Sequence, residues 1–301
     1  MVKLLVESTP AKINLFLRVV GRRADGYHEL DSVFIPVSLW DRVRIEMRLE
    51  ERAADRTAIA LGCNRDDIPT GERNLAWRAA DGFLREFGPA IRAPRDVAID
   101  LHKEIPAGAG LGGGSSDAGA VLRMMAALCR VAGDEERLAR LALALGADVP
   151  YFLHPRIAHV RGVGERIEPV ATVSDKWKSA PLCMVIAVPP VEVSTAQVFR
   201  ALKPEHWSGP APEEHLRAVA AGRIMPGMLR NDLAAVAMAQ YPEIARLREA
   251  LIAAGADDAS MSGSGGAVFG IFANAGRAAA AAERLRREGP GARYYVVNSL
   301  T

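Results

Sequence analysis

The stretch Pro-Ala-Gly-Ala-Gly-Leu-Gly-Gly-Gly-Ser-Ser-Asp, from Pro106 to Asp117, decides the fold of this chain. The residues upstream, Val97 to His102, alternate in polarity and predict a strand, whereas Ala118 to Cys129 has the apolar spacing of a helix. Three residues of types that cap helix starts lie just before that helix: Ser115, Ser116 and Asp117. In such a strand–loop–helix unit, bare backbone N–H groups and the positive end of the helix dipole converge, which predicts an anion site and favours phosphate.

Two common glycine motifs do not account for this loop. Gly108, Gly110 and Gly113 match the dinucleotide-binding pattern G-x-G-x-x-G, but that motif needs a second parallel strand after its helix, and the segment from Asp134 to Gly146 predicts another helix. A Walker A loop ends in G-K-[ST], yet this stretch contains no lysine. The hypothesis that remains is a phosphate loop that takes positive charge from elsewhere in the chain. The alternative, a turn that serves only helix packing, is disfavoured because glycine costs backbone entropy without a packing return.

Composition narrows the class of protein. The chain has 301 residues, of which 50% are hydrophobic and 25% are charged, and its formal net charge is +2. These values are typical of a globular chain of one or two domains and give no argument for a nucleic-acid or membrane partner. The three cysteines are far apart, so no disulfide framework is indicated, and the first residues lack the apolar region of a signal peptide. A cytoplasmic location is therefore expected.

The first half of the chain predicts several strands in series and then helices. Strands are expected at Lys3–Glu7, Ala11–Val20, Leu30–Leu39, Asp41–Leu49 and Ile157–Arg161, with a turn at Gly21–Gly26 and a helix at Asn74–Phe87. Strands that follow one another without intervening helices indicate an antiparallel or mixed sheet rather than a series of βαβ units.

The second half predicts a β-α-β-β-α-β order with inserted helices, which is typical of a ferredoxin-like domain. Strands are expected at Leu182–Val188, Ala259–Met261, Ala267–Phe272 and Tyr294–Ser299, and helices at Thr195–Leu202, Glu213–Ala221, Leu233–Gln240, Pro242–Ala254 and Gly276–Arg287. The polar segment Asp175–Pro181 separates the two halves. We therefore expect two domains, at residues 1–175 and 176–301.

Lys12, Asn14 and Asp148 are the side chains that could supply chemistry to a phosphate loop. Lys12 and Asn14 alternate on one face of an expected strand, and Asp148 follows the second helix after the loop. Taken singly, a solvated strand lysine and a loop-capping aspartate are the commoner outcomes. Phosphoryl transfer, however, needs charge neutralisation and a carboxylate that accepts the proton of the attacking hydroxyl. These residues together with a loop that lacks lysine favour phosphoryl transfer.

Two further stretches leave alternatives open. Tyr27 and His28 follow the turn after the Lys12 strand. They could stack on a planar ring and hydrogen-bond its edge, or Tyr27 could pack on the sheet. The glycine-rich loop from Ser262 to Gly266 could be a tight hairpin or a second backbone surface that closes over a ligand. Spacing along the sequence does not separate these hypotheses.

Three blocks resemble, in order, the signature motifs of the GHMP small-molecule kinases. They are P-A-K-I-N-L-F-L-R-V-V-G-R-R-A-D-G-Y-H (Pro10 to His28), P-A-G-A-G-L-G-G-G-S-S-D-A (Pro106 to Ala118) and M-S-G-S-G-G-A-V-F-G (Met261 to Gly270). Within that superfamily the first block is similar to the family of 4-diphosphocytidyl-2-C-methyl-D-erythritol kinases of the non-mevalonate isoprenoid pathway. Shorter segments that resemble the same family are Arg73–Ala80, Gly146–Pro150 and Gly162–Glu165. The segment from Lys203 to Gly227 matches no motif.

The resemblance implies an α+β, two-domain GHMP kinase fold, with an N-terminal mixed-sheet (ribosomal-protein-S5-like) domain and a C-terminal ferredoxin-like domain. It also implies an ATP-dependent kinase that phosphorylates the 2-hydroxyl of a small molecule, CDP-methylerythritol, with Mg²⁺ present. Ser116 is the expected hydroxyl near the metal, and no acidic pair marks a dedicated metal site. We expect a monomer or weak homodimer.

The functional residues of the family fall on matching positions of this sequence. Lys12 is expected to polarise the acceptor hydroxyl and Asp148 to act as general base. The ATP phosphates are expected to lie on Pro106, Ala107, Gly108, Ala109, Gly110, Leu111, Gly112, Gly113, Gly114, Ser115 and Ser116. Substrate contacts are expected from Asn14, Tyr27, His28, Thr195 and Phe199, with Tyr27 and Phe199 on the two sides of the cytosine.

Two other functions stay open. One is another GHMP kinase with a different acceptor, and the other is a nucleotide-binding protein without catalysis. The Tyr27–His28 pair argues against the first, because a substrate without a nucleobase gives the pair no role. Lys12 and Asp148 argue against the second, because nucleotide binding alone does not need a catalytic lysine and base.

Overall fold

The computed structural model describes residues 1–49, 57–88, 91, 94–131, 133–171 and 176–301. Two compact units divide the chain and interleave along its sequence. The first comprises Met1–Ala11, Trp40–Ile105 and Gly112–Pro155, and the second comprises Lys12–Leu39, Pro106–Leu111 and Arg156–Thr301. The expected domain boundary lies between residues 175 and 176, directly after residues 172–175, which lie outside the described residues, so the division at 1–175 and 176–301 stays a prediction.

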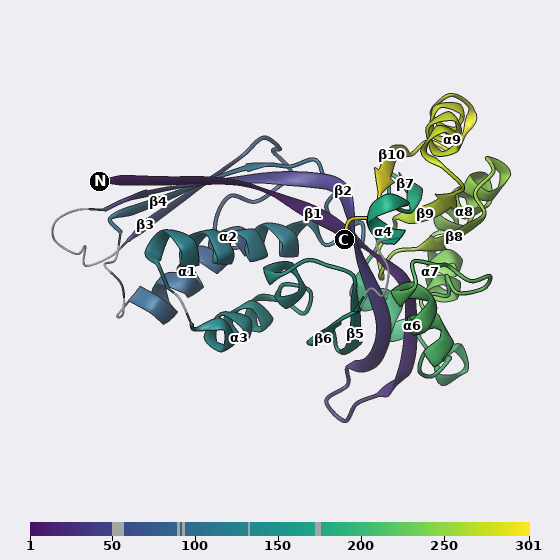
Figure 1. The fold of residues 1–301 in the computed structure, drawn as a ribbon, viewed down its shortest axis with the longest axis horizontal. Helices are drawn as coiled ribbons and strands as arrows, with labels where there is room; N and C mark the ends of the chain where they lie inside the picture. The colour runs from purple at the N-terminus through teal and green to yellow at the C-terminus, as the bar shows by residue number, and fades with distance from the viewer. Residues whose placement is uncertain (50–56, 89–90, 92–93, 132, 172–175) are drawn as a thin grey trace. The chain divides into compact units, whose positions relative to one another are not determined.

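A mixed sheet forms the frame of the first unit. The beginning of β1 (Val2–Arg22) pairs with the end of β2 (His28–Arg48), and β2 pairs antiparallel with β4 (Asp96–His102). β4 pairs parallel with β3 (Ala58–Cys63). Figure 1 shows three helices together on one side of these strands: α1 (Leu75–Phe87), α2 (Gly113–Cys129) and α3 (Glu135–Leu145). The expectation of a mixed sheet followed by helices is confirmed.

The apolar periodicity of these elements explains their packing. Alternate side chains of β2 and β4 are buried in one cluster with the helices: Val43, Ile45, Met47, Val97, Ile99 and Leu101. α1 adds Phe83 and Phe87 to this cluster, and the side chain of Asn74 caps its start by accepting a hydrogen bond from the backbone N of Ala76. Full burial of each large apolar side chain stabilises the fold by roughly 1.5–3 kcal/mol.

Two expected pairs of strands are single long strands. Lys3–Glu7 and Ala11–Val20 both belong to β1, and Leu30–Leu39 and Asp41–Leu49 both fall on β2, apart from the last residue. A proline removes one ladder donor without forbidding an extended backbone, so β1 continues through Pro10. β3 was not expected, because it alternates only between small and apolar residues and shows no change of polarity.

The second unit contains the expected ferredoxin-like sheet. The strands β7 (Cys183–Val188), β8 (Asp258–Met261), β9 (Val268–Phe272) and β10 (Arg293–Asn298) pair antiparallel in the order β10-β7-β9-β8. The helices α8 (Pro242–Ala253) and α9 (Ala275–Glu288) bury side chains in the same core as this sheet. The predicted β-α-β-β-α-β order is confirmed, with each strand within two residues of its expected bounds.

Shorter elements complete the second unit. Between β7 and β8 lie α5 (Thr195–Ala201), the 3₁₀ helix η3 (Pro204–His206), α6 (Glu213–Ala220) and α7 (Ala234–Gln240), and before β7 lies α4 (Lys176–Ser179). The beginning of β2 pairs with β5 (Ala158–Gly162), which pairs with β6 (Arg166–Pro169). The three cysteines are free thiols. Among the helices of the described residues, none has the length and apolar character needed to cross a membrane.

Candidate nucleotide-binding and catalytic site

The glycine loop adopts a backbone that only glycine accepts readily. Gly108 and Gly110 have φ angles of 68° and 80°, and Gly112, the N-cap of α2, has a φ of 74°. Because Gly112 ends the loop, Ser115, Ser116 and Asp117 lie inside α2 and do not cap it. The capping expectation was wrong for this reason, whereas the strand–loop–helix order was confirmed.

A second glycine loop (Ser262–Gly266) packs its backbone against the first one. A methyl group on Gly110 would lie 2.2 Å from the carbonyl oxygen of Ser262, and one on Gly265 would lie 2.3 Å from the backbone N of Gly110. The hydroxyl of Ser262 also donates a hydrogen bond to the carbonyl oxygen of Gly110, at 3.1 Å. The second glycine loop is therefore not an isolated hairpin, because it forms a backbone surface that fixes Gly110.

Lys12 is a buried side chain and not a solvated one. It is 3% exposed, its Nζ donates to Asn14 Oδ1 at 2.7 Å, and the Nζ lies 4.6 Å from the centre of the Phe34 ring. The backbone N of Lys12 donates to the carbonyl oxygen of Leu111, and the backbone N of Asn14 donates to the hydroxyl of Ser262. Both glycine loops are thus attached to the strand that carries Lys12. Burial of an ammonium group is costly, so this placement points to a function.

In the first turn of α2, one serine hydroxyl is buried and hydrogen-bonded and the other is partly exposed. The Ser116 hydroxyl is fully buried, donates to the carbonyl oxygen of Pro10 at 2.7 Å and lies 2.6 Å from Thr9 Oγ1. Its oxygen is already engaged, which leaves the partly exposed Ser115 as the first-turn hydroxyl nearer to solvent. The first N–H groups of a helix have no intrahelical acceptor, so the start of α2 retains donors for an anion.

Asp148 lies in the first unit, in the turn between α3 and the 3₁₀ helix η2 (Pro150–Leu153). It is partly exposed, as expected for a carboxylate at a helix exit. Burial and the charge of Asp148 raise the pKa of Tyr151 well above its ordinary value, so this phenol stays protonated. The family role of Asp148 as general base stays a prediction.

The ring of His28, at the start of β2, lies beside two aromatic side chains. Its centroid is 5.4 Å from that of Phe199, at an interplanar angle of 31°, and 6.1 Å from that of Trp207, at 81°. Burial, with a smaller contribution from the charge of Arg22, lowers the pKa of His28, so the imidazole is neutral at pH 7 and offers one donor and one acceptor nitrogen. Tyr27 is 66% exposed and does not pack on the sheet, which removes one of the two alternatives for this residue.

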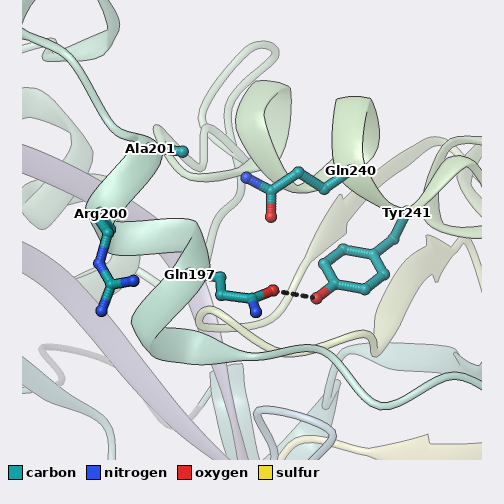
Figure 2. Close-up of a pocket in the computed structure, with 5 residues that line it drawn as sticks. All are labelled: Gln197, Arg200, Ala201, Gln240 and Tyr241. Atoms are coloured by element: carbon teal, nitrogen blue, oxygen red, sulfur yellow. Dashed lines mark hydrogen bonds between the residues drawn. The ribbon is translucent and has the colours of Figure 1, made fainter.

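α5 carries Thr195 and Phe199 and is held from two sides. The Thr195 hydroxyl lies 2.8 Å from that of Ser264 in the second glycine loop. Figure 2 shows the other side, where the hydroxyl of Tyr241 donates to Gln197 Oε1 at 3.3 Å. The same hydroxyl accepts a hydrogen bond from the backbone N of Ser194, the N-cap of α5. An open hollow with the polar side chains of Gln197, Arg200, Gln240 and Tyr241 lies along this face.

Three parts of the site were not expected from the sequence. Trp207 lies in the segment that matched no motif, yet it contacts His28. Asn231 donates its amide N–H groups to the carbonyl oxygens of Met261 and Gly263 and so supports the second glycine loop. Lys103 forms a buried cluster with two aspartates beside α2. These contacts join residues far apart in sequence, and no spacing pattern indicates them.

Comparisons with known proteins identify two family models and several relatives. Residues 74–156 match the GHMP kinases N terminal domain, and residues 214–291 match the GHMP kinases C terminal family. A 4-diphosphocytidyl-2-C-methyl-D-erythritol kinase of Geobacter metallireducens is 38% identical over 284 residues, which cover 94% of this chain and 94% of the relative. The protein of the same name from Symbiobacterium thermophilum is 41% identical, with 92% and 93% covered.

Solved structures agree with the sequence relatives. A crystal structure of 4-(cytidine 5'-diphospho)-2C-methyl-D-erythritol kinase, 39% identical, matches with a TM-score of 0.80 and covers 99% of this chain and 100% of its own. Homoserine kinase from Cytophaga hutchinsonii matches with a TM-score of 0.68 at 18% identity, with 99% and 95% covered. At that low identity the second match shows a shared fold only.

Proposed function

The chain belongs to the 4-diphosphocytidyl-2-C-methyl-D-erythritol kinase family, and from this membership we propose that it transfers the γ-phosphoryl group of ATP to the 2-hydroxyl of CDP-methylerythritol. The observation that carries the proposal is the attachment of two glycine loops to the strand that holds the buried Lys12. The strand that carries the cation is thus bonded to the backbone of the first glycine loop and to a side chain of the second. This combination is what a phosphate loop without its own lysine requires.

The donor site is Pro106–Ser116, which comprises the glycine loop and the first turn of α2. Three positive-φ glycines expose backbone, and the N-terminus of α2 adds N–H groups and the positive end of its dipole. Among the described residues, no group of three or more His, Cys, Asp or Glu side chains is placed to hold a metal. When Mg²⁺ is bound together with ATP, phosphate and water oxygens would hold it, and it would supply charge neutralisation.

The acceptor site is formed by the aromatic residues around His28. A neutral imidazole can pair with the edge of a cytosine, while Phe199 and the exposed Tyr27 supply ring surfaces for stacking. Thr195 and Asn14 both contact the second glycine loop. An acceptor that carries a nucleobase fits this set of side chains.

The transfer itself uses two charged groups. The Asp148 carboxylate accepts the proton of the 2-hydroxyl, whose oxygen forms a bond to the γ-phosphorus as the bond to the β–γ bridging oxygen breaks and ADP leaves. The Lys12 ammonium offsets the negative charge of the transferred group, and Asn14 holds its Nζ in place. Positioning and electrostatics, rather than covalent catalysis, lower the barrier.

A coupled ADP-release assay across four acceptors tests the substrate assignment. We expect turnover with CDP-methylerythritol and none with methylerythritol phosphate, mevalonate or homoserine, because only the first carries the cytosine that His28 and Tyr27 recognise. Turnover with mevalonate or homoserine, and none with CDP-methylerythritol, would overturn the proposal.

Two variants test the roles of the charged groups. Asp148→Asn and Lys12→Met should each lower kcat by about 10²–10⁴-fold, because each removes a group that acts in the transition state. Asp134→Asn, which changes a half-exposed carboxylate at the start of α3, is the matched control and should retain wild-type kcat. An Asp148→Asn enzyme within a few-fold of wild type would show that another group is the base.

A further inference from the structure

A buried charge cluster lies in the first unit, at the start of α2. Lys103 Nζ donates to Asp41 Oδ2 and to Asp117 Oδ2, the second at 2.5 Å. Lys103, Asp41 and Asp117 are 6%, 0% and 3% exposed. Burial alone would lower the pKa of Lys103, but the two carboxylates raise it above its ordinary value, so this lysine is a cation. In the sequence it is the lysine nearest to the glycine loop, and its ammonium group is buried.

The cluster is bonded to the chain just before the glycine loop. Asp41 Oδ1 accepts hydrogen bonds from the backbone N of Glu104 at 2.7 Å and from that of Ile105 at 2.9 Å. These two residues are the last before Pro106. One carboxylate oxygen of Asp41 thus fixes the entry to the loop, and the other is bound to Lys103.

The cluster is also bonded to the chain just after the loop. Asp117 lies one helical turn beyond Gly113, the first residue of α2, so its bond to Lys103 holds that turn in place. A methyl group on Gly113 would lie 2.9 Å from Ile105 Cγ2 and 3.3 Å from Lys103 Nζ. The two ends of the loop therefore touch each other over the cluster.

Stability alone does not explain three buried ionisable side chains. Removing each ion from water costs several kcal/mol, and well-packed apolar side chains of similar volume often stabilise a fold as well or better. Hydrogen bonds to charged groups fix the orientation of donor and acceptor, whereas apolar packing is not directional. The cluster is thus suited to orienting the backbone that it binds.

We propose that Lys103, Asp41 and Asp117 form an internal clamp that orients both ends of the glycine loop for the phosphates of ATP. The three are positioning residues and do not touch the nucleotide. The inference rests on the function proposed above, since it takes the glycine loop to be the ATP site. In this arrangement Lys103, which precedes the loop, holds the two ends of the loop, while Lys12 serves the transferred group.

Asp117→Ala is the central test, because it removes the tie to α2 and leaves the Lys103–Asp41 pair intact and neutral. We expect KM for ATP to rise by about tenfold, while KM for CDP-methylerythritol stays within about twofold and the cooperative thermal unfolding transition is retained. Asp117→Asn keeps an acceptor for Lys103 and should restore KM for ATP close to the wild-type value. Asp100→Asn, an exposed carboxylate on β4 that pairs with Arg44, is the matched control.

Three results would overturn the clamp. They are an unchanged KM for ATP in Asp117→Ala, a parallel rise of both KM values, and an Asp117→Asn enzyme as impaired as Asp117→Ala. Lys103→Met, which cuts both ties, should raise KM for ATP further if it folds. Should it fail to fold, the Asp117 variants still decide the question.

A loop variant separates this inference from the proposed function. Gly114 is exposed, and a methyl group there would come no closer than 3.7 Å to Leu75 Cδ1, so Gly114→Val adds a side chain to the first turn without a clash at its Cβ. If the loop binds phosphate, KM for ATP should rise by at least about tenfold. A rise in Gly114→Val without one in Asp117→Ala rejects the clamp and keeps the ATP site. No rise in either variant rejects the glycine loop as the ATP site.

Discussion

The two parts of the glycine loop are held by opposite means. In the first unit, the buried carboxylates of Asp41 and Asp117 and the ammonium of Lys103 fix the ends of the loop by charged hydrogen bonds. In the second unit, Gly110 is fixed by backbone contact with Gly265, where no side chain separates the two backbone segments. The charged anchor orients the backbone at the ends of the loop, and its strength depends on the protonation of the carboxylates. The glycine anchor sets the distance between the two loops, and it tolerates no side chain at Gly110 or Gly265. Each anchor can therefore be broken by a change that leaves the other intact.

The largest effect is expected at the glycine anchor. A methyl group on Gly265 would lie 2.3 Å from the backbone carbon of Ala109 and from the backbone N of Gly110, and neither atom can move without moving the loop. Gly265→Ala should therefore cost roughly 3 kcal/mol in the unfolding free energy and lower kcat/KM for ATP by at least about 10²-fold. Urea unfolding and steady-state kinetics measure the two.

Gly266→Ala is the matched control for this prediction. Its methyl group would meet Pro189 Cγ at 3.1 Å and Val193 Cγ2 at 3.2 Å, which are side-chain atoms that can give way. We expect kcat/KM for ATP to stay within a few-fold of wild type. Equal losses in the two variants would show that the contact between the glycine loops does not set the geometry of the site.

The acceptor pocket should respond separately from both anchors. Trp207→Ala removes the ring that lies edge-on to His28 and frees the imidazole to rotate. We expect KM for CDP-methylerythritol to rise by about tenfold and KM for ATP to stay unchanged, because neither anchor involves Trp207. A rise in KM for ATP alone would contradict the assignment of this pocket to the acceptor.

The charged anchor predicts a pH dependence that the glycine anchor lacks. Burial, opposed by Lys103 and reinforced by Asp41, raises the pKa of Asp117 from 3.8 to about 7. The folded chain thus binds this proton more tightly than the unfolded chain, so the contribution of Asp117 to the unfolding free energy is greatest below about pH 4, falls as pH rises to about 7 and is constant above that.

Urea unfolding at about pH 5 and about pH 8 checks this effect. Asp117→Asn cannot titrate, so it should lose less stability than wild type between the two pH values. Gly266→Ala, which lies at the other anchor, should lose the same amount as wild type. A pH dependence shared by wild type and Asp117→Asn would assign the titration to another group.

The smallest effect is expected from Ser262→Ala. This change removes a hydroxyl that accepts from the backbone N of Asn14 and donates to the carbonyl oxygen of Gly110, but it leaves the glycine contact in place. Loss of such hydrogen bonds costs about 1 kcal/mol, so KM for ATP should rise only a few-fold. A loss as large as that of Gly265→Ala would mean that the hydroxyl, and not the backbone contact, is the anchor.

Local patterns account for what the sequence predicted well. The strands β4 and β7 to β10 follow from the local alternation of polarity. Their bounds were predicted to within two residues. The burial of Lys12 was not visible, since a strand lysine has the same pattern in solvent or in the interior. Its candidacy came instead from the absence of a lysine in the glycine loop, together with the resemblance to the GHMP kinases.

Tertiary contacts account for what the sequence did not predict. The residue types at Ser115, Ser116 and Asp117 are typical of a helix cap. The helix begins earlier, after the left-handed Gly112, so these three residues lie inside it. Asp117 meets Lys103 and Asp41 only after the sheet and α2 have packed. Trp207 has no motif and gains its place beside His28 through the fold. In each case the residue type was visible and its partner was not.

A double-mutant cycle on KM for ATP tests most directly whether the two anchors serve one loop. Asp117→Ala weakens the charged anchor, Ser262→Ala removes the hydrogen bond that holds Gly110 beside the glycine anchor, and each should raise KM for ATP on its own. If both contacts hold the same phosphate-binding loop, loss of one already loosens the loop that the other holds. The rise in KM for ATP of the double variant should then be clearly smaller than the product of the two single rises. A rise equal to that product would show two independent sites and contradict the account.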